Sequence, residues 1–89
     1  MKSKISLPYS TRIGNFFKDH RLSKGFSQKD LADELGVNKQ FVSNWERGLC
    51  SPPMDAVKQI TSLLRIPKKN VVTLFVEETE KSLKTAFRR

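Results

Sequence analysis

The sequence has little of the chemistry that enzymes and metal sites require. Its 89 residues include one cysteine, Cys50, and one histidine, His20. A single cysteine cannot form a disulfide within the chain, and one Cys with one His does not complete a structural zinc set. His20 has no nucleophile or carboxylate partner at the spacing of a catalytic motif. We therefore expect no catalytic residues, no metal and no cofactor.

Long apolar runs are also missing. No stretch approaches the roughly 20 residues that cross a bilayer, and the basic N-terminus lacks the apolar core of a signal peptide. A role at a membrane surface needs a strongly basic amphipathic helix, whereas the last third of the chain carries Glu77, Glu78 and Glu80. We therefore expect a cytoplasmic protein without a membrane partner.

Positive charge is what the chain has in excess. Seventeen Lys and Arg residues against nine Asp and Glu residues give a formal net charge of +8. This imbalance suggests a polyanionic partner such as nucleic acid, although a basic surface that only promotes solubility gives the same count. Hydrophobic residues make up 37% of the chain, which is enough for one small helical core.

The pattern of caps, stops and apolar residues predicts an all-α fold with five helices. Thr11, Ser27 and Asn38 are the expected N-caps of the first three helices, and Gly25 and Gly36 are the expected stops of the first two. The expected helices cover residues 12–24, 28–35 and 39–47, a fourth segment from about residue 54 to before Pro67, and residues 68–86. We expect residues 1–10 to form a flexible basic arm and residues 11–89 to form one domain.

The last expected helix carries more apolar residues than the core of so small a domain needs. Its stripe comprises Val72, Phe75, Val76, Leu83, Ala86 and Phe87. Two arrangements would use it. Phe75, Val76 and Leu83 could form a dimer interface with a second copy, or the helix could fold back on the first helix and bury Ile13 and Phe17.

Residues 27–48 form the most informative motif, which reads as two short helices joined by a tight turn. Gly36 permits the turn, Ala32 allows the helices to cross closely, and Leu35, Val42 and Trp45 form the inner side. Four polar side chains then face outward on the second of these helices: Lys39, Gln40, Ser43 and Asn44. Gln and Asn can form paired hydrogen bonds with adenine, and Lys with guanine, so this helix suits the DNA major groove.

Phe41 is the one large apolar residue that helical spacing does not place fully inside. Its ring could contact a thymine methyl group or the DNA backbone. It could equally pack against the N-terminal part of the helical bundle.

These residues resemble the helix-turn-helix family that includes phage lambda-type repressors and Cro proteins. The matching residues are Gln28, Ala32, Gly36, Val42 and Trp45, preceded by Ser27 and followed by Glu46-Arg47-Gly48. The resemblance covers about residues 12–75. It implies a compact five-helix lambda-repressor-like domain in which the second and third helices form the helix-turn-helix.

The resemblance also implies roles for individual residues. Lys39, Gln40, Ser43 and Asn44 would contact bases, and Arg21 and Glu46 would form a structural ion pair. The implied phosphate contacts are Gln28, Asn38, Arg47, Gly48 and Ser51. The chain departs from the family at His20, where an apolar residue is common, and at Pro53, where Ser or Thr usually caps the fourth helix.

The expected function is sequence-specific binding of double-stranded DNA by a transcriptional repressor. A homodimer would bind a palindromic operator, because one small module contacts few bases. The alternative is an antitoxin or adaptor of a toxin-antitoxin or restriction-control system. Such a protein would bind a partner protein, such as a toxin, and would regulate its own promoter.

Overall fold

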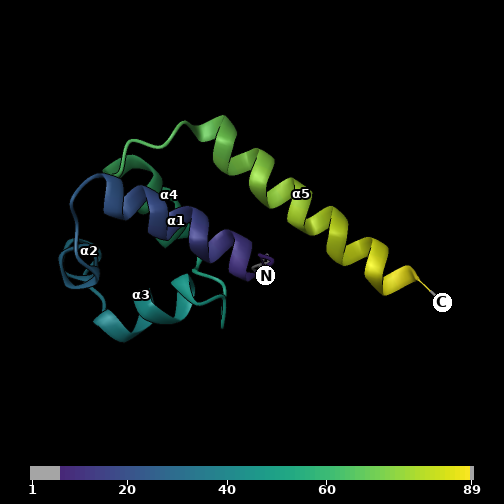
Figure 1. Ribbon diagram of the computed structural model, residues 1–89, viewed down its shortest axis with the longest axis horizontal. Coiled ribbons are helices and arrows are strands. Elements are labelled where there is room, and N and C mark those ends of the chain that lie inside the picture. The colour runs from purple at the N-terminus through teal and green to yellow at the C-terminus, as the bar shows by residue number, and fades with distance from the viewer. Residues whose placement is uncertain (1–6, 89) are drawn as a thin grey trace, which may run out of the picture.

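The computed structural model describes residues 7–88, and these residues form five helices and no strand (Figure 1). The helices are α1 (Thr11–Ser23), α2 (Gln28–Leu35), α3 (Lys39–Glu46), α4 (Met54–Leu63) and α5 (Lys68–Phe87). The expectation of an all-α fold is confirmed. None of the helices in the described part of the chain is long and apolar enough to cross a membrane.

Side-chain caps fix the starts of the first three helices. Ser27 Oγ accepts a hydrogen bond from the Asp30 amide at 2.9 Å, and the Asp30 carboxylate accepts one from the Ser27 amide at 2.9 Å. This reciprocal capping box lowers the pKa of Asp30, because the Ser27 amide stabilises the charged carboxylate. Asn38 caps α3 by accepting a hydrogen bond from the Gln40 amide at 2.8 Å.

The expectation that Thr11 caps α1 is wrong. Ser10 Oγ accepts a hydrogen bond from the Ile13 amide at 3.2 Å, and Thr11 is the first helical residue. Ser and Thr are both good caps. Where two such residues are adjacent, the sequence does not show which of them is the cap, so the predicted start of the helix can be wrong by one residue.

Gly36 makes the tight turn between α2 and α3. Its φ of 71° lies in the left-handed region that glycine adopts without strain. The Gly36 amide donates to the Asp33 carbonyl and the Val37 amide donates to the Ala32 carbonyl at 3.0 Å, a pattern that ends a helix abruptly. The turn is therefore short enough to hold α2 and α3 as one unit.

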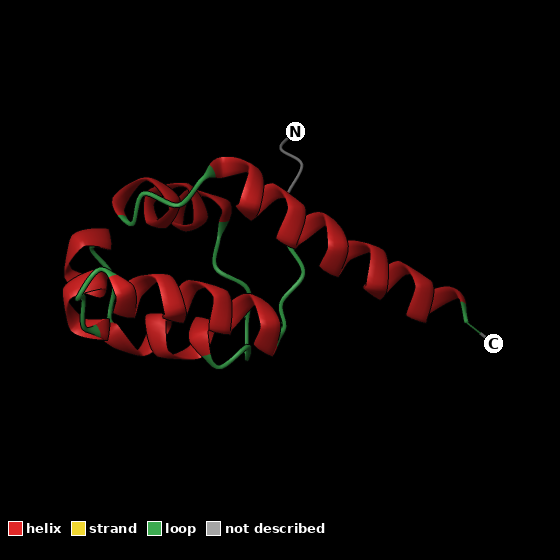
Figure 2. Cartoon of the chain, turned by 45° about the horizontal axis from the view of Figure 1, so that its top comes forward, coloured by secondary structure: helices red, strands yellow, loops and turns green. Residues whose placement is uncertain are grey.

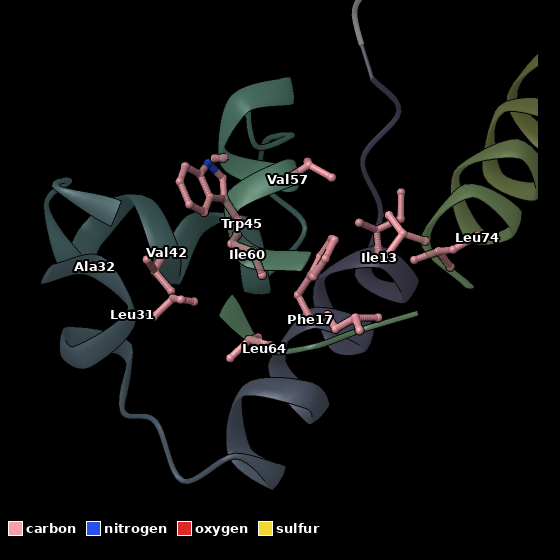
Figure 3. Packing of buried hydrophobic residues seen from close by; sticks show 13 residues of the cluster. Ile13, Phe17, Leu31, Ala32, Val42, Trp45, Val57, Ile60, Leu64 and Leu74 are labelled. Carbon is pink, nitrogen blue, oxygen red and sulfur yellow. The ribbon is translucent and has the colours of Figure 1, made fainter. Parts of the chain in front are cut away.

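Buried side chains from all five helices meet in one core (Figure 3). Leu64 is fully buried, and Ala32 and Val42 are each 1% exposed. The other labelled members of this core are Ile13, Phe17, Leu31, Trp45, Val57, Ile60 and Leu74. Val42 and Trp45 anchor α3 to this core. The core therefore fixes the orientation of α3 in the domain.

Helix α5 is the longest helix, and its C-terminal part extends away from the other four helices (Figure 2). Val71 and Leu74 are buried, and the Phe75 ring lies 6.2 Å from the Phe17 ring on α1. The N-terminal half of α5 thus packs back on the domain. The described part of the chain before α1 also approaches α5, since Leu7 is half-buried and lines a hollow together with Leu83.

The apolar stripe of α5 is divided between the core and the surface. Val71 and Leu74, which the expected stripe omitted, face the core, and Phe75 is half-buried. The other five members of the stripe are exposed: Val72, Val76, Leu83, Ala86 and Phe87. Of the expected N-terminal arm, residues 1–6 lie outside the described residues, and residues 7–10 run between α1 and α5, where Ser10 caps α1.

Candidate nucleic-acid interface

Helix α3 separates its residues sharply into a buried side and an outer side. Val42, Trp45 and Glu46 are buried. On the outer side, Lys39, Gln40 and Phe41 are exposed and Ser43 and Asn44 are half-buried. Figure 1 shows α3 at the lower edge of the molecule. The four side chains expected to contact bases therefore lie together on one accessible surface.

Gln40 and Asn44 are joined to each other on this surface. Gln40 Nε2 donates to Asn44 Oδ1 at 3.0 Å, and Arg47 Nη2 donates to the same oxygen at 3.1 Å. Among the hydrogen bonds of residues 7–88, none engages Oε1 of Gln40 or Nδ2 of Asn44. An acceptor and a donor thus remain on adjacent turns of the helix, which is the pair of groups that recognises adenine N6 and N7.

Phe41 is 52% exposed, and its ring centroid lies 6.4 Å from that of Trp45 on the same helix. About half of Phe41 is therefore open to solvent, and the ring that it lies beside belongs to its own helix. Two factors explain its position: Trp45 fills the inner side of α3, and Phe41 has a neighbouring ring to rest on. An apolar ring is available on the outer surface beside Gln40.

A buried ion pair holds α3 against α1. Arg21 Nε lies 2.6 Å from Glu46 Oε2, and Arg21 Nη2 lies 2.9 Å from Glu46 Oε1. Arg21 Nη1 also donates to the Phe26 carbonyl at 2.7 Å. A forked, two-bond pairing fixes both position and orientation. The pair neutralises Glu46, so α3 presents only cations to solvent at its two ends, Lys39 and Arg47.

Gln28 joins the same ion pair. Its Nε2 donates to Glu46 Oε1 at 3.0 Å, and the residue is half-buried. Since the side-chain amide of glutamine has two N–H donors, one remains for another acceptor. Gln28 therefore links the first turn of α2 to α3 in addition to any outward contact.

Gly14 is a residue that the sequence analysis missed. A Cβ atom at this position would lie 2.2 Å from the carbonyl oxygen of Glu46, so only glycine allows α1 and α3 to pack this closely. The sequence does carry a local sign of this close packing. Glycine in the middle of a helix costs roughly 0.5–1 kcal/mol relative to alanine, which points to a close approach of another backbone.

A hollow of about 550 Å³ lies at the N-terminus of α2. Ser27, Gln28, Lys29 and Lys39 line it on one side, and the end of α1 lines it on the other. The first amides of a helix carry partial positive charge and attract anions. The Lys29 ammonium is paired with Asp33 at 2.9 Å, so Lys39 is the cation of this hollow that has no carboxylate within salt-bridge distance in the described part of the chain.

The other implied phosphate contacts lie elsewhere. Arg47 and Gly48 follow directly after α3, at the end of the helix remote from Lys39. The Asn38 side-chain oxygen is used in capping α3, and Ser51 Oγ donates to the Pro52 carbonyl at 3.3 Å. Asn38 thus lies at the start of α3, whereas Gln28 bonds to Glu46, the last residue of α3, and Arg47, Gly48 and Ser51 follow that end of the helix.

The single histidine and the single cysteine both lie partly buried beside other side chains. The His20 ring is half-buried, 4.7 Å from the Phe16 ring, and Cys50 is partly buried against the core. Within residues 7–88 no group of three or more His, Cys, Asp or Glu residues is placed to hold a metal ion.

Comparison with known proteins identifies relatives of this arrangement. A helix-turn-helix family model matches residues 17–69. An uncharacterized HTH-type transcriptional regulator of Mycobacterium tuberculosis is 37% identical over 53 residues, which are 60% of this chain and 38% of the relative. The HTH-type transcriptional regulator SinR of Bacillus subtilis is 33% identical over 69 residues, which are 76% of this chain and 60% of SinR. The chain thus spans less than two thirds of the length of these curated relatives.

A solved structure is also similar. It is the crystal structure of SinR, the master regulator for biofilm formation, in complex with DNA. The similarity covers 62% of this chain and 89% of that chain, with a TM-score of 0.57 and 32% sequence identity.

Proposed function

Because this chain belongs to the helix-turn-helix family, as the match over residues 17–69 establishes, we propose that it is a transcriptional regulator that binds double-stranded DNA. The observation that carries the proposal is the division of α3. Its inner side is fixed by the core and by the ion pair of Glu46, and its outer side holds a row of base-compatible polar groups. The solved relative SinR was crystallised in complex with DNA.

In this proposal α3 lies in the major groove. Gln40 and Asn44 act together on an adenine, because their mutual hydrogen bond leaves the Gln40 Oε1 acceptor and the Asn44 Nδ2 donors to face the base. Lys39 favours guanine O6 and N7, and Ser43 contacts a base or the adjoining backbone. Phe41 contacts a thymine methyl group or a sugar, since its ring is half exposed beside Gln40.

Phosphate contacts position the protein from both ends of α3. The start of α2, with Gln28, meets one strand, and Arg47 with the amides from Gly48 to Ser51 meets the other. Asn38 contributes its side-chain NH₂ group at the start of α3. An α-helix with its side chains is about 10–12 Å across, which fits the roughly 12 Å width of the major groove.

We further propose that the protein acts as a homodimeric repressor on a palindromic operator. Two copies bind half-sites about one helical turn apart, which is how small modules reach specific affinity. Val76 and Leu83 on α5 are 57% and 54% exposed and form the proposed contact. Phe75 contributes less, because its ring packs on Phe17 of the same chain. A dimer on a promoter represses transcription by occluding it.

One experiment tests both parts. Duplexes that bind the protein are selected from a random pool, and the mass of the protein on its preferred duplex is then measured. We expect an enriched inverted repeat that carries two chains. No enrichment would contradict sequence reading by α3. A single enriched half-site with one chain would contradict the dimer and leave the base contacts standing.

A further inference from the structure

An apolar groove with a basic rim lies between α4 and α5, outside the surface proposed for DNA. It measures about 700 Å³. Met54, Val71 and Val72 are part of its apolar floor, and the charged side chains that line it are Lys58, Arg65 and Lys68, with no acidic residue among its lining. Met54 and Val72 are 44% and 60% exposed. We call this feature the α4–α5 groove.

Arg65 occupies its place on the rim at a conformational cost. Its φ of 55° makes it the one non-glycine residue of positive φ within residues 7–88. The Ile66 amide donates to the Thr61 carbonyl at 2.9 Å, which is the helix end that normally has glycine at this position. Strained residues cluster where a side chain has a binding role. Arg65 thus combines a position on the rim with a backbone conformation that glycine would adopt more easily.

The groove is remote from the recognition helix. In Figure 1 the connection between α4 and α5 lies at the upper edge of the molecule, whereas α3 lies at the lower edge. None of the residues that line the groove belongs to α2, α3 or the loop that follows α3. A ligand in the groove leaves the outer side of α3 accessible.

We propose that the α4–α5 groove binds an acidic amphipathic helix of a partner protein. Apolar side chains on successive turns of such a helix cover Met54, Val71 and Val72, as in other helix-in-groove complexes. Glutamate or aspartate residues on its flanks meet Lys58, Arg65 and Lys68. The charge of the rim selects against basic helices, and the apolar floor selects against acidic segments without a hydrophobic face.

Two other occupants fit less well. The C-terminal part of α5 from a second copy would offer Leu83 and Phe87, but the cations Lys81, Lys84 and Arg88 of the same segment would meet the basic rim. A DNA backbone would satisfy the cations and leave the apolar floor uncovered. Both are distinguishable outcomes of the test.

The test titrates the ¹⁵N-labelled full chain with a synthetic peptide of about four helical turns, with leucine at helical spacing and glutamate between. We expect chemical-shift changes confined to the groove. A peptide of the same composition with scattered leucines should bind roughly tenfold more weakly, because it cannot cover the floor. Arg65→Gly should weaken binding about two- to fivefold without lowering Tm, since glycine adopts the positive φ freely.

Two further variants sharpen the result. Met54→Asp, at an exposed first position of α4, should weaken binding roughly tenfold or more by removing floor and adding a like charge. Lys18→Ala removes a charge that does not line the groove and should leave the affinity unchanged. These measurements need no operator, so they stand apart from the proposed function.

Four outcomes would overturn the proposal. Equal binding of the scrambled peptide would show attraction by charge alone. Shift changes on α3 would place the peptide on the DNA surface, and displacement of the peptide by duplex would make DNA the occupant. Self-association in the absence of peptide that Met54→Asp abolishes would make a second copy the occupant.

Discussion

Arg21 and Glu46 are 25 residues apart in the sequence and form a two-bond ion pair with side chains only 6% and 4% exposed. The carboxylate also accepts a hydrogen bond from Gln28. One buried charge therefore holds α1, α2 and α3 in a single arrangement. The orientation of α3 depends on this pair as well as on the apolar core.

Replacing Arg21 with alanine should lower the free energy of unfolding by about 3–5 kcal/mol, because it leaves the buried Glu46 carboxylate without its cation. Urea unfolding followed by circular dichroism measures the change. Arg12→Ala is the matched control, since Arg12 pairs with Glu77 and Glu78 while its own side chain is 48% exposed. It should cost much less, because solvent screens an exposed ion pair. Equal costs would refute the role assigned to the buried pair.

Gly14→Ala should destabilise the protein by about 1–3 kcal/mol, although alanine is the better helix former. The added Cβ would lie 2.2 Å from the Glu46 carbonyl oxygen, so α1 and α3 must separate. Asn15→Ala, at the adjacent exposed position, should be neutral or slightly stabilising. Thermal unfolding compares the two variants. A Gly14→Ala protein as stable as Asn15→Ala would contradict the close packing.

Gln40→Ala or Asn44→Ala should lose about 1–3 kcal/mol of discrimination at one base pair of the selected duplex. The two losses should not add, because each residue orients the other through their hydrogen bond. Fluorescence anisotropy on the selected duplex and its single-base variants, with the double variant included, measures the coupling. Lys18→Ala serves as the control. Unchanged discrimination in both single variants would remove these residues from base recognition.

Arg47→Ala should weaken binding to all duplexes alike and should reduce the slope of log K against log salt by about 1, as expected for one phosphate contact. It should leave base preference unchanged. Anisotropy at several salt concentrations gives the slope. A changed base preference, with the slope retained, would place Arg47 on a base edge.

Low pH should weaken the attachment of α5 to α1, because it protonates Glu78, which pairs with Arg12. The hydrogen bond from Lys81 lowers the pKa of Glu78 most, and the bond from Arg12 adds to this, while burial opposes both. A carboxylate whose pKa is lowered by folding stabilises the fold fully above its unfolded pKa of about 4.5. That stability is lost as the pH falls through the lower folded pKa.

Unfolding measured from pH 7 to pH 3 should therefore show a shallower loss of stability for Glu78→Gln than for the parent chain. Glu80→Gln, on the exposed side of the same helix, is the control and should follow the parent. Identical pH profiles for the parent and Glu78→Gln would assign the acid sensitivity to other carboxylates.

Sequence reasoning succeeded where the determinants are local. The cap at Ser27, the cap at Asn38 and the turn at Gly36 each depend on neighbouring residues. It failed at Ser10, because two adjacent hydroxyl residues compete for one cap. Within the site, periodicity correctly placed Val42 and Trp45 inside and four polar side chains outside.

The features that sequence reasoning missed depend on contacts between distant segments. Apolar residues occur on both sides of α5, so the pattern alone did not show that Val71 and Leu74 face the core. Packing on Phe17 and the ion pairs of Arg12 decide the rotation of that helix. The bond from Gln28 to Glu46 and the fit of Gly14 likewise appear only when α1, α2 and α3 are brought together.

The division of α3 into a buried side and an exposed side has a consequence for how the target preference of such a protein can evolve. Lys39, Gln40 and Phe41 contribute little to the core, while Val42, Trp45 and Glu46 carry the attachment of the helix. A combinatorial library at the outer positions should yield many folded variants with new target preferences. The residues that preserve the fold and the residues that set the target preference are therefore different residues of one short helix.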